Sequence, residues 1–300
     1  MSGDKKKIIK YGQAVEYLPP RLRDAAMNFS DNEKAQIEEF RLRAGQKFSV
    51  CIGGTEKNAT PEFVVRHEEL RTVLELATRS SVHTAQASIR EGYVTVFGGH
   101  RIGLCGTAIR SGNEIGGIRE LSSVVIRIAK SITDAADGLE NIVLNNTSFK
   151  NTLIVSPPGY GKTTMLRDLI RRLSDRGKRV CLVDERGEVA AKHRGMSQFD
   201  VGKCTDVLDG AEKAEGALLM LRAMTPEIIA LDEIATKRDI EAIKAIANCG
   251  VGIIATAHGE STEVLLKRPI YKELFDLDIF KVIILLKKSG AKYTYETEER

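Results

Sequence analysis

The feature that most constrains the fold is a phosphate-binding pattern at Ser156–Thr164. It reads Ser-Pro-Pro-Gly-Tyr-Gly-Lys-Thr-Thr and directly follows the apolar run 152–155. A G-x-x-x-x-G-K-[ST] pattern between a buried strand and a helix is typical of a P-loop, which binds phosphate through backbone amides and a helix N-terminus. Ser156 stands where the pattern has its first glycine, so the match is one residue short. The pattern predicts a nucleotide site at this place.

The residues around and after this motif alternate between apolar runs and amphipathic segments. Helices are predicted at 164–175, 211–224 and 238–247. Short apolar runs of the buried-strand type occur at 152–155, 180–183, 228–231 and 252–256. Strands that alternate with helices form parallel sheets that are covered on both faces. The C-terminal half is therefore predicted to be α/β with a mainly parallel sheet.

The N-terminal half has the mixed pattern of a smaller α+β domain. Helices are predicted at 16–27 and 32–40, with Ser30 or Asp31 as the N-cap between them. Further along, a strand at 61–67 is predicted to lead into a helix.

Two further features indicate a hairpin and the boundary between the two domains. Alternating apolar residues on both sides of Gly98-Gly99 predict a hairpin. The polar stretch near 137–150 separates the two patterns. We therefore place an α+β N-terminal domain at 1–140 and a P-loop domain at 141–300.

The motif residues have the chemistry needed to hold ATP and Mg²⁺, the predicted cofactors. Gly159 and Gly161 let backbone N–H groups wrap a phosphate at φ angles that side chains resist. Lys162 supplies charge to the β- and γ-phosphates, and the Thr163 hydroxyl is a ligand for Mg²⁺. The predicted nucleotide contacts are Ser156, Pro157, Pro158, Gly159, Tyr160, Gly161, Lys162, Thr163 and Thr164.

Hydrolysis also needs a carboxylate for the metal and a second one for the attacking water. Asp232 and Glu233 directly follow the third apolar run, 228–231. We assign Asp232 to Mg²⁺ and Glu233 to the attacking water as general base. Asp184-Glu185 ends the strand before it, and the ends of parallel strands share one crevice. Glu185 is a supporting candidate; the alternative is a surface pair with Arg186.

Polar residues also follow the last predicted strand. We assign a γ-phosphate sensor to Thr256 or His258, against the alternative of a histidine that satisfies backbone groups at a strand end. The N-terminal half is rich in arginine, which can neutralise charge on the γ-phosphate, although most arginines are merely solvated.

The composition narrows the classes of function. A net charge of +4 and the absence of Trp do not favour a dedicated nucleic-acid binder. The five cysteines are scattered, which argues against a disulfide framework or a zinc site. The apolar runs 251–257 and 282–286 are too short to span a bilayer. We expect a cytoplasmic protein without direct membrane insertion; if it works at a membrane, another component holds it there.

The order of these motifs resembles that of the type II and type IV secretion ATPases, hexameric members of the RecA-like group. A closer resemblance is to the stage III sporulation protein AA family of endospore-forming bacteria, over residues 15–285. It is carried by Tyr17-Leu-Pro-Pro-Arg-Leu-Arg, Phe40-Arg-Leu-Arg-Ala-Gly, Gly98-Gly-His-Arg-Ile-Gly-Leu-Cys-Gly, Asp184-Glu-Arg-Gly-Glu and Thr205-Asp-Val-Leu-Asp-Gly.

The resemblance implies a RecA-like P-loop NTPase domain, a homo-hexamer and an ATPase that serves a channel-like complex between mother cell and forespore, with membrane proteins as partners. It also implies that arginines of the N-terminal domain reach the nucleotide, and Arg101 and Arg127 match those positions. Secretion ATPases usually carry Gly-Glu where this chain has Asp232-Glu233.

Three functions are therefore weighed. The first is an oligomeric ATPase that powers or assembles a secretion-like channel. The second is a nucleic-acid-dependent ATPase of the RecA or helicase-loader type, with Lys5–Lys7 and arginines as phosphate contacts. The third is a scaffold that binds ATP only to assemble, which the intact Lys162, Thr163, Asp232 and Glu233 disfavour.

Overall fold

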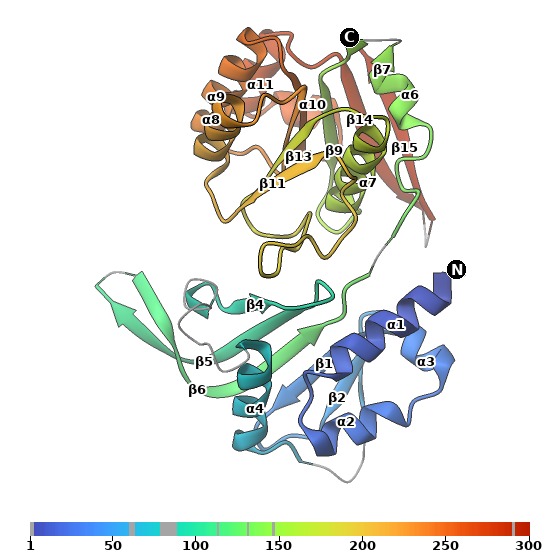
Figure 1. Cartoon of the computed structure of the whole chain (residues 1–300), viewed down its shortest axis with the longest axis vertical. Coiled ribbons are helices and arrows are strands. Elements are labelled where there is room, and N and C mark those ends of the chain that lie inside the picture. The colour runs from blue at the N-terminus through green and yellow to red at the C-terminus, as the bar shows by residue number, and fades with distance from the viewer. Residues whose placement is uncertain are drawn as a thin grey trace. The chain divides into compact units, whose positions relative to one another are not determined.

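The computed structural model describes residues 3–59, 64–78, 89–112, 114–130, 132–145, 148–289 and 292–300. The chain divides into two compact units (Figure 1). The first comprises Met1–Ser131 with Ala191–Gln198, and the second comprises Ile132–Ala190 with Phe199–Arg300. Within the described ranges, no helix is long and apolar enough to cross a membrane.

The first unit is built on an antiparallel sheet in the order β3-β2-β1-β6-β5-β4. Aromatic rings of Tyr11, Phe40 and Phe48 meet in its core, with centroids 5.3 and 6.1 Å apart for successive pairs. Its elements are α1 (Gly3–Val15), α2 (Pro20–Met27), α3 (Asp31–Gln36), β1 (Ile37–Arg43), β2 (Ser49–Ile52), β3 (Thr55–Asn58), α4 (His67–Thr78), β4 (Tyr93–Thr95), β5 (Arg101–Ser111) and β6 (Glu114–Arg127).

Two helix predictions for this unit are corrected by the structure. The helix predicted at 16–27 begins only at Pro20, because a proline fits the first turn of a helix but not its interior. The helix predicted at 32–40 is wrong beyond Gln36. Ser30 does cap α3 through a capping box with Glu33, but the buried side chains that follow lie in strand β1.

The other local predictions for this unit fare differently. The hairpin is confirmed, since β4 and β5 pair antiparallel across Gly98-Gly99, both of which have positive φ. Of the strand predicted at 61–67, residues 61–63 lie outside the described residues, and Val64 forms an isolated bridge with Lys47.

The division between the units differs from the predicted boundary at 140/141. The second unit begins at Ile132, because Ala136, Leu139 and Val143 are fully buried in its core. The segment Ala191–Gln198 belongs to the first unit although it lies in the P-loop half of the sequence. There the Gln198 side chain accepts a hydrogen bond from the N–H of Gly98 at 2.9 Å.

The second unit contains a sheet in the order β11-β10-β12-β13-β9-β14-β15. All neighbours are parallel except β14 and β15, so the sheet is mainly parallel, as the alternation predicts. Its strands are β9 (Thr152–Ser156), β10 (Val180–Asp184), β11 (Thr205–Asp209), β12 (Ile228–Leu231), β13 (Gly252–His258), β14 (Val282–Ser289) and β15 (Lys292–Glu299). The short β7 (Leu144–Asn145) and β8 (Ser148–Phe149) form a separate hairpin.

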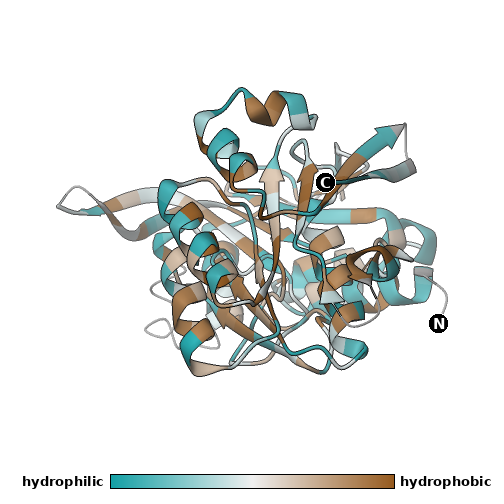
Figure 2. Ribbon diagram, turned by 90° about the horizontal axis from the view of Figure 1, so that it is seen from above, coloured by the Kyte–Doolittle hydropathy of each residue, from teal (hydrophilic) through white to brown (hydrophobic). Residues whose placement is uncertain are grey.

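Helices cover both faces of this sheet (Figure 1). Helices α6 (Leu139–Val143) and α7 (Lys162–Asp175) pack on one face, and α8 (Lys213–Ala223), α9 (Lys237–Asn248), α10 (Thr262–Leu266) and α11 (Pro269–Asp276) pack on the other. Figure 2 shows apolar residues along the strands and alternating apolar and polar residues along the helices. Strands buried on both faces explain why the predicted runs are continuously apolar.

Asp168 joins helix α7 to the start of the second unit. Its carboxylate is 2% exposed and accepts hydrogen bonds from the N–H of Ala136 at 2.9 Å and from Arg171 and Arg172. Burial raises the pKa of this carboxyl, but the hydrogen bonds outweigh burial and hold the pKa below its usual value. The folded state therefore favours the ionised carboxylate.

Replacing Asp168 by asparagine should lower the free energy of unfolding by about 3 kcal/mol at pH 7, because the variant leaves buried donors without their charged partner. Since the folded pKa is depressed, this stabilisation is present above the unfolded pKa of about 3.9. It is lost as the pH falls toward the lower folded pKa. Urea unfolding of both proteins at pH 7 and at pH 3 measures the two effects.

Asp175 on the same helix supplies a matched control. Its carboxylate is 46% exposed and pairs with Arg171 at 3.3 Å. Asp175→Asn should cost less than about 1 kcal/mol, because exposed ion pairs contribute little. Equal losses for the two variants would contradict the role given to Asp168.

Candidate functional site

The P-loop lies between the end of β9 and the start of α7, as the sequence predicts. Gly159 and Gly161 adopt φ angles of 77° and 84°, and a Cβ added at either glycine would meet nothing within 4 Å. This backbone therefore borders open space at the N-terminus of a helix, where an anion is favoured. Ser156 ends strand β9 without a positive φ, so the glycine usual at this position is not required.

Lys162 is the residue that points most directly to an anion site. Its residue is 7% exposed, and its Nζ has no hydrogen-bond partner in the described part of the chain. Burial lowers the pKa of this amine, and the carboxylates of Asp232 and Glu233 oppose that shift. A buried cation without direct hydrogen bonds is costly unless a ligand completes its shell. The donor set and the glycine backbone together fit the phosphates of a magnesium nucleotide.

The two predicted catalytic carboxylates directly follow strand β12. The hydroxyl of Thr256, on the neighbouring strand β13, contacts the side chain of Asp232 and the backbone of Glu233. Its Oγ1 donates to Asp232 Oδ1 at 2.9 Å and accepts from the backbone N–H of Glu233 at 2.7 Å. Burial raises the pKa of Asp232, while the Thr256 hydrogen bond and the charge of Lys162 oppose the rise. A bound divalent cation would favour the ionised form of Asp232.

Glu233 has an unusual backbone conformation. Its φ is 45°, in the left-handed region that L-residues other than glycine rarely adopt. Such a conformation costs on the order of 1–2 kcal/mol and persists only where the surroundings impose it. Strain of this kind at a strand end next to a P-loop is typical of functional positions.

His258 ends strand β13 opposite Ser156 in the parallel register, so it lies at the first residue of the P-loop motif. Its Nε2 is 3.3 Å from Glu233 Oε1, and Arg186 approaches Glu233 Oε2 at 3.8 Å. Nδ1 of His258 is buried without a hydrogen-bond partner among the described residues. The structure therefore brings Glu233 and His258 together, with Arg186, which the sequence analysis considered only as a partner of Glu185.

Glu185 lies near this cluster but is engaged elsewhere. Its carboxylate pairs with the amine of Lys213 on α8. The neighbouring Asp184 is 1% exposed and accepts backbone N–H groups of residues 188–190 at 2.8–3.2 Å. Asp184 thus fixes the loop after β10. The catalytic role predicted for Glu185 stays a prediction.

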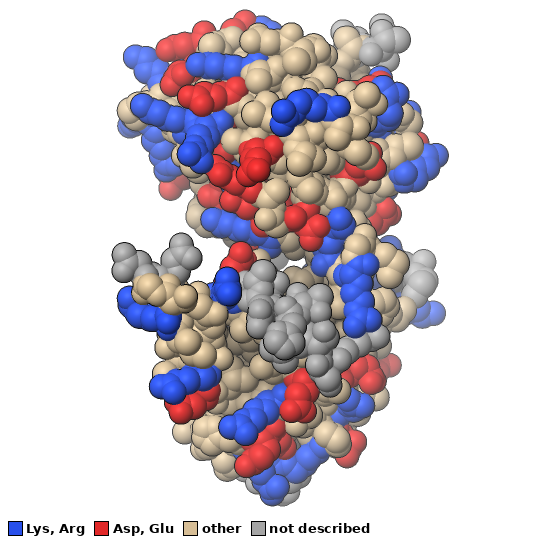
Figure 3. Space-filling view, turned by 60° about the vertical axis from the view of Figure 1, so that its left-hand side comes forward, with Lys and Arg blue, Asp and Glu red and all other residues tan. Residues whose placement is uncertain are grey.

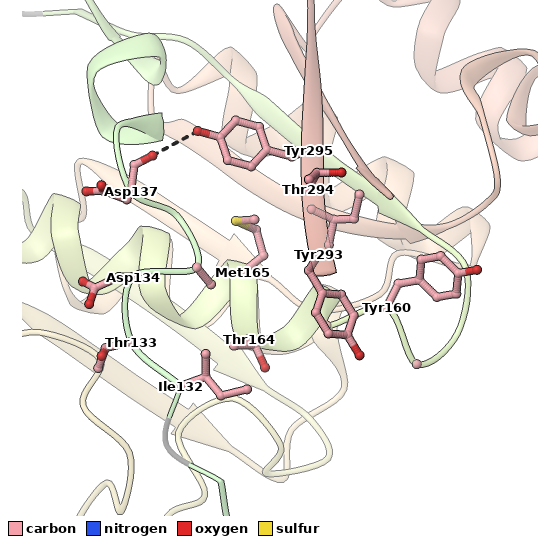
Figure 4. Close-up of a pocket in the computed structure, with 14 residues that line it drawn as sticks. Ile132, Thr133, Asp134, Asp137, Tyr160, Thr164, Met165, Tyr293, Thr294 and Tyr295 are labelled. Carbon is pink, nitrogen blue, oxygen red and sulfur yellow. Dashed lines mark hydrogen bonds between the residues drawn. The ribbon is translucent and has the colours of Figure 1, made fainter. Parts of the chain in front are cut away.

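A cavity of about 550 Å³ adjoins the P-loop inside the second unit. Segment 132–137, the P-loop and strand β15 border it, and Figure 4 shows Tyr160 and Tyr293 at one side. The hydroxyl of Tyr295 donates to the carbonyl of Asp137 at 3.0 Å, which ties β15 to the segment opposite (Figure 4). The apolar lining includes Ile132, Met165 and Leu286. A flat aromatic ring system fits such a cavity.

Only part of this cavity was predictable from the sequence. Tyr160 and Thr164 were predicted as nucleotide contacts, and both line it. Tyr293 and Tyr295 were not predicted. Their spacing of two residues in a strand was the available signal, since such residues lie on one face.

Arg101 and Arg127 belong to the first unit. The guanidinium of Arg101 stacks 3.5 Å from the ring centroid of Tyr93. Arg127 is 65% exposed in its side chain and pairs with Glu39 at 3.3 Å. Their approach to a nucleotide stays a prediction.

The fold and the P-loop geometry are those of a P-loop ATPase-like α/β protein. The chain is similar to the ATPase DotB of Yersinia pseudotuberculosis, with 16% identity, a TM-score of 0.61, and coverage of 93% of this chain and 79% of that chain. It is also similar to the pilus retraction motor PilT with bound ADP, with 15% identity, a TM-score of 0.61, and coverage of 88% and 79%. At these identities the likeness is one of fold.

The family follows from the sequence itself. The model of the family described as "Sporulation stage III, protein AA" matches residues 10–296. Stage III sporulation protein AA of Bacillus subtilis (strain 168) is 35% identical over 288 residues, which cover 94% of this chain and 92% of that protein. The chain belongs to the stage III sporulation protein AA family, and the resemblance noted in the motifs is confirmed.

Replacing Lys162 by methionine should leave the nucleotide-free protein at least as stable as the wild type. The variant removes a buried amine that has no hydrogen-bond partner among the described residues. We expect a gain of about 1 kcal/mol in the free energy of unfolding. Urea unfolding without nucleotide measures it. Lys213→Met, which removes the partner of Glu185, is the control and should give no gain. A clear loss for Lys162→Met would show that the amine is already satisfied.

Proposed function

We propose that this chain hydrolyses ATP with Mg²⁺ and that hydrolysis powers or assembles a secretion-like transmembrane channel complex during endospore formation. The observation that carries the proposal is the buried amine of Lys162, which has no hydrogen-bond partner among the described residues and lies beside the open P-loop backbone. Membership of a sporulation family and a fold like that of secretion and pilus ATPases support the biological setting.

The P-loop residues would bind the triphosphate. Backbone N–H groups around Gly159 and Gly161, at the N-terminus of α7, would donate to the phosphate oxygens. Lys162 would recover in this contact the hydrogen bonds that it lacks. Thr163 and Asp232 would hold Mg²⁺, which supplies positive charge to the phosphate oxygens as charge develops on them.

Glu233 would then act on water. Its carboxylate would accept a proton from the water that attacks the γ-phosphorus, and the bond to the leaving ADP oxygen would break. His258 and Arg186 approach the two oxygens of this carboxylate and would hold it in place. Nδ1 of His258, which is buried without a hydrogen-bond partner among the described residues, would contact the γ-phosphate.

The cavity beside the P-loop would take the adenine ring. Tyr160 and Tyr293 provide aromatic faces for stacking, and Met165 and Leu286 provide apolar contacts. The fit of the cavity to a base supports nucleotide binding independently of the phosphate contacts.

Oligomerisation and partners belong to the same proposal. A hexamer would bring Arg101 or Arg127 to a nucleotide and neutralise transition-state charge. Membrane proteins of the channel complex would hold the ATPase at the cytoplasmic face of the membrane.

The nucleic-acid-dependent alternative has less support. On the face that Figure 3 shows, the described Lys and Arg residues lie among Asp and Glu on both units, without a broad field of one sign. Nucleic-acid binders commonly concentrate basic residues on one face. Strong stimulation of ATP turnover by single-stranded DNA, weakening with salt, would favour this alternative.

Steady-state ATP turnover tests the leading function. Wild-type turnover per chain should rise with protein concentration, because oligomerisation completes the site. Glu233→Gln should lower kcat by about 10²–10⁴-fold, since the general base is lost. Glu241→Gln, at an exposed position on α9, is the control and should turn over ATP like the wild type.

Two outcomes would overturn parts of this scheme. Nucleotide binding without turnover, in the presence of channel proteins as well, would support the scaffold function. Unchanged turnover in Glu233→Gln would move the general base to Glu185.

The base cavity gives a separate prediction. Tyr293→Ala should weaken ATP binding about tenfold or more, because loss of base stacking on an aromatic ring costs on the order of 1–3 kcal/mol. Tyr293→Phe keeps the ring and should bind like the wild type. Titration with a fluorescent ATP analogue labelled on the ribose measures both. Equal affinity for Tyr293→Ala and the wild type would place the base elsewhere.

A further inference from the structure

We propose that Thr256 is the positioning residue that holds Glu233 ready to act on water, and that it does not contact the nucleotide. The inference rests on the proposed ATPase function and adds a component to its site. Thr256 is fully buried in strand β13, which lies between the P-loop strand β9 and the carboxylate strand β12. Its hydroxyl therefore stands at the junction of the two halves of the site.

The one donor of the Thr256 hydroxyl is used within the protein. A threonine hydroxyl has one hydrogen to donate, and Thr256 donates it to Asp232 Oδ1 at 2.9 Å. The same oxygen accepts the N–H of Glu233 at 2.7 Å. No donor is left for a γ-phosphate, and the side chain has no exposed surface. Of the two sensor candidates considered from the sequence, this geometry leaves His258.

The contacts of Thr256 also account for the strained backbone of Glu233. The N–H of Glu233 binds the Thr256 hydroxyl, and the N–H of Ile234 binds the Thr256 carbonyl at 2.9 Å. Thr256 thus holds two successive amides around a residue at φ 45°. On the far side, the Tyr271 hydroxyl donates to the carbonyl of Ile234 at 2.7 Å. Relaxation of Glu233 to a common conformation would have to break these contacts.

This arrangement assigns separate tasks to residues on one strand. Thr256 binds the backbone of Glu233 and so fixes the position from which the Glu233 side chain extends. His258, two residues further along β13, contacts the carboxylate itself at 3.3 Å. Successive odd or even positions of a strand share a face, so both residues act toward β12 from the same side. The Thr256 hydroxyl would influence the rate of hydrolysis through Glu233, without contributing to nucleotide binding.

The test compares Thr256→Val, Thr256→Ser and Thr152→Val with the wild type. Valine keeps the shape of threonine and removes the hydroxyl, whereas serine keeps the hydroxyl. Thr152→Val is the matched control, because Thr152 is also fully buried in the same sheet and donates to the Lys150 carbonyl at 2.7 Å, at the opposite end of β9. Thermal unfolding of all four proteins shows which are folded. Steady-state kcat and KM, and affinity for ADP without Mg²⁺, are then measured.

The expected result is a split between rate and binding. Thr256→Val should lose about 10²-fold in kcat, the scale expected when a catalytic group is misplaced by an ångström. Its affinity for ADP without Mg²⁺ should match the wild type, Thr256→Ser should restore kcat, and Thr152→Val should keep kcat. These results together would support a positioning role.

Other results overturn the inference. If Thr256→Val turns over ATP like the wild type, Thr256 is a structural residue and the ATPase function stands. If it loses affinity for ADP instead of kcat, Thr256 supports nucleotide binding. If Thr256→Val does not fold, failure of the folded Thr256→Ser to retain kcat overturns the inference, because serine preserves both hydrogen bonds. If the wild type itself shows no turnover, the proposed function fails and the inference falls with it.

Discussion

The buried amine of Lys162 is the constraint around which the second unit is organised. Its Nζ has no hydrogen-bond partner in the part of the chain that the structure describes. A cation buried in this way opposes folding, so the rest of the unit must supply the stability that keeps it there. Strands buried on both faces and helix α7, fastened by Asp168, supply it. The P-loop then presents positive charge and open backbone to an anion that the chain itself does not provide.

The sequence predicted those parts of the site whose chemistry is local. The glycine backbone, Lys162 and the strand-end pair Asp232-Glu233 follow from short patterns, because turn conformation and strand ends depend on neighbouring residues. The helix predicted over 32–40 failed for a non-local reason. The Ser30 cap starts a helix as expected, but Ile37, Phe40 and Leu42 gain more by burial in a sheet whose other strands come from distant sequence.

The same reason explains what was missed at the site. Tyr293 lies far from the P-loop in sequence, and only the position of β14 beside β9 brings its hairpin to the cavity beside the P-loop. Thr256 was considered as a sensor because it ends a strand, but its hydrogen bonds to the next strand could not be read from spacing. Both the placement of Tyr293 and the hydrogen bonds of Thr256 depend on the order of the strands in the sheet, which no local sequence pattern determines.

The docking of Ala191–Gln198 in the first unit has a consequence for how this protein can be divided. The chain leaves one unit and returns to it, so a cut after Ser131 does not yield two complete pieces. A fragment starting at Ile132 would carry Gln198 without Gly98, its hydrogen-bond partner. It would also expose the segment Ala191–Gln198, which packs within the first unit. The two units are therefore interlaced along the chain, and neither corresponds to one continuous stretch of sequence.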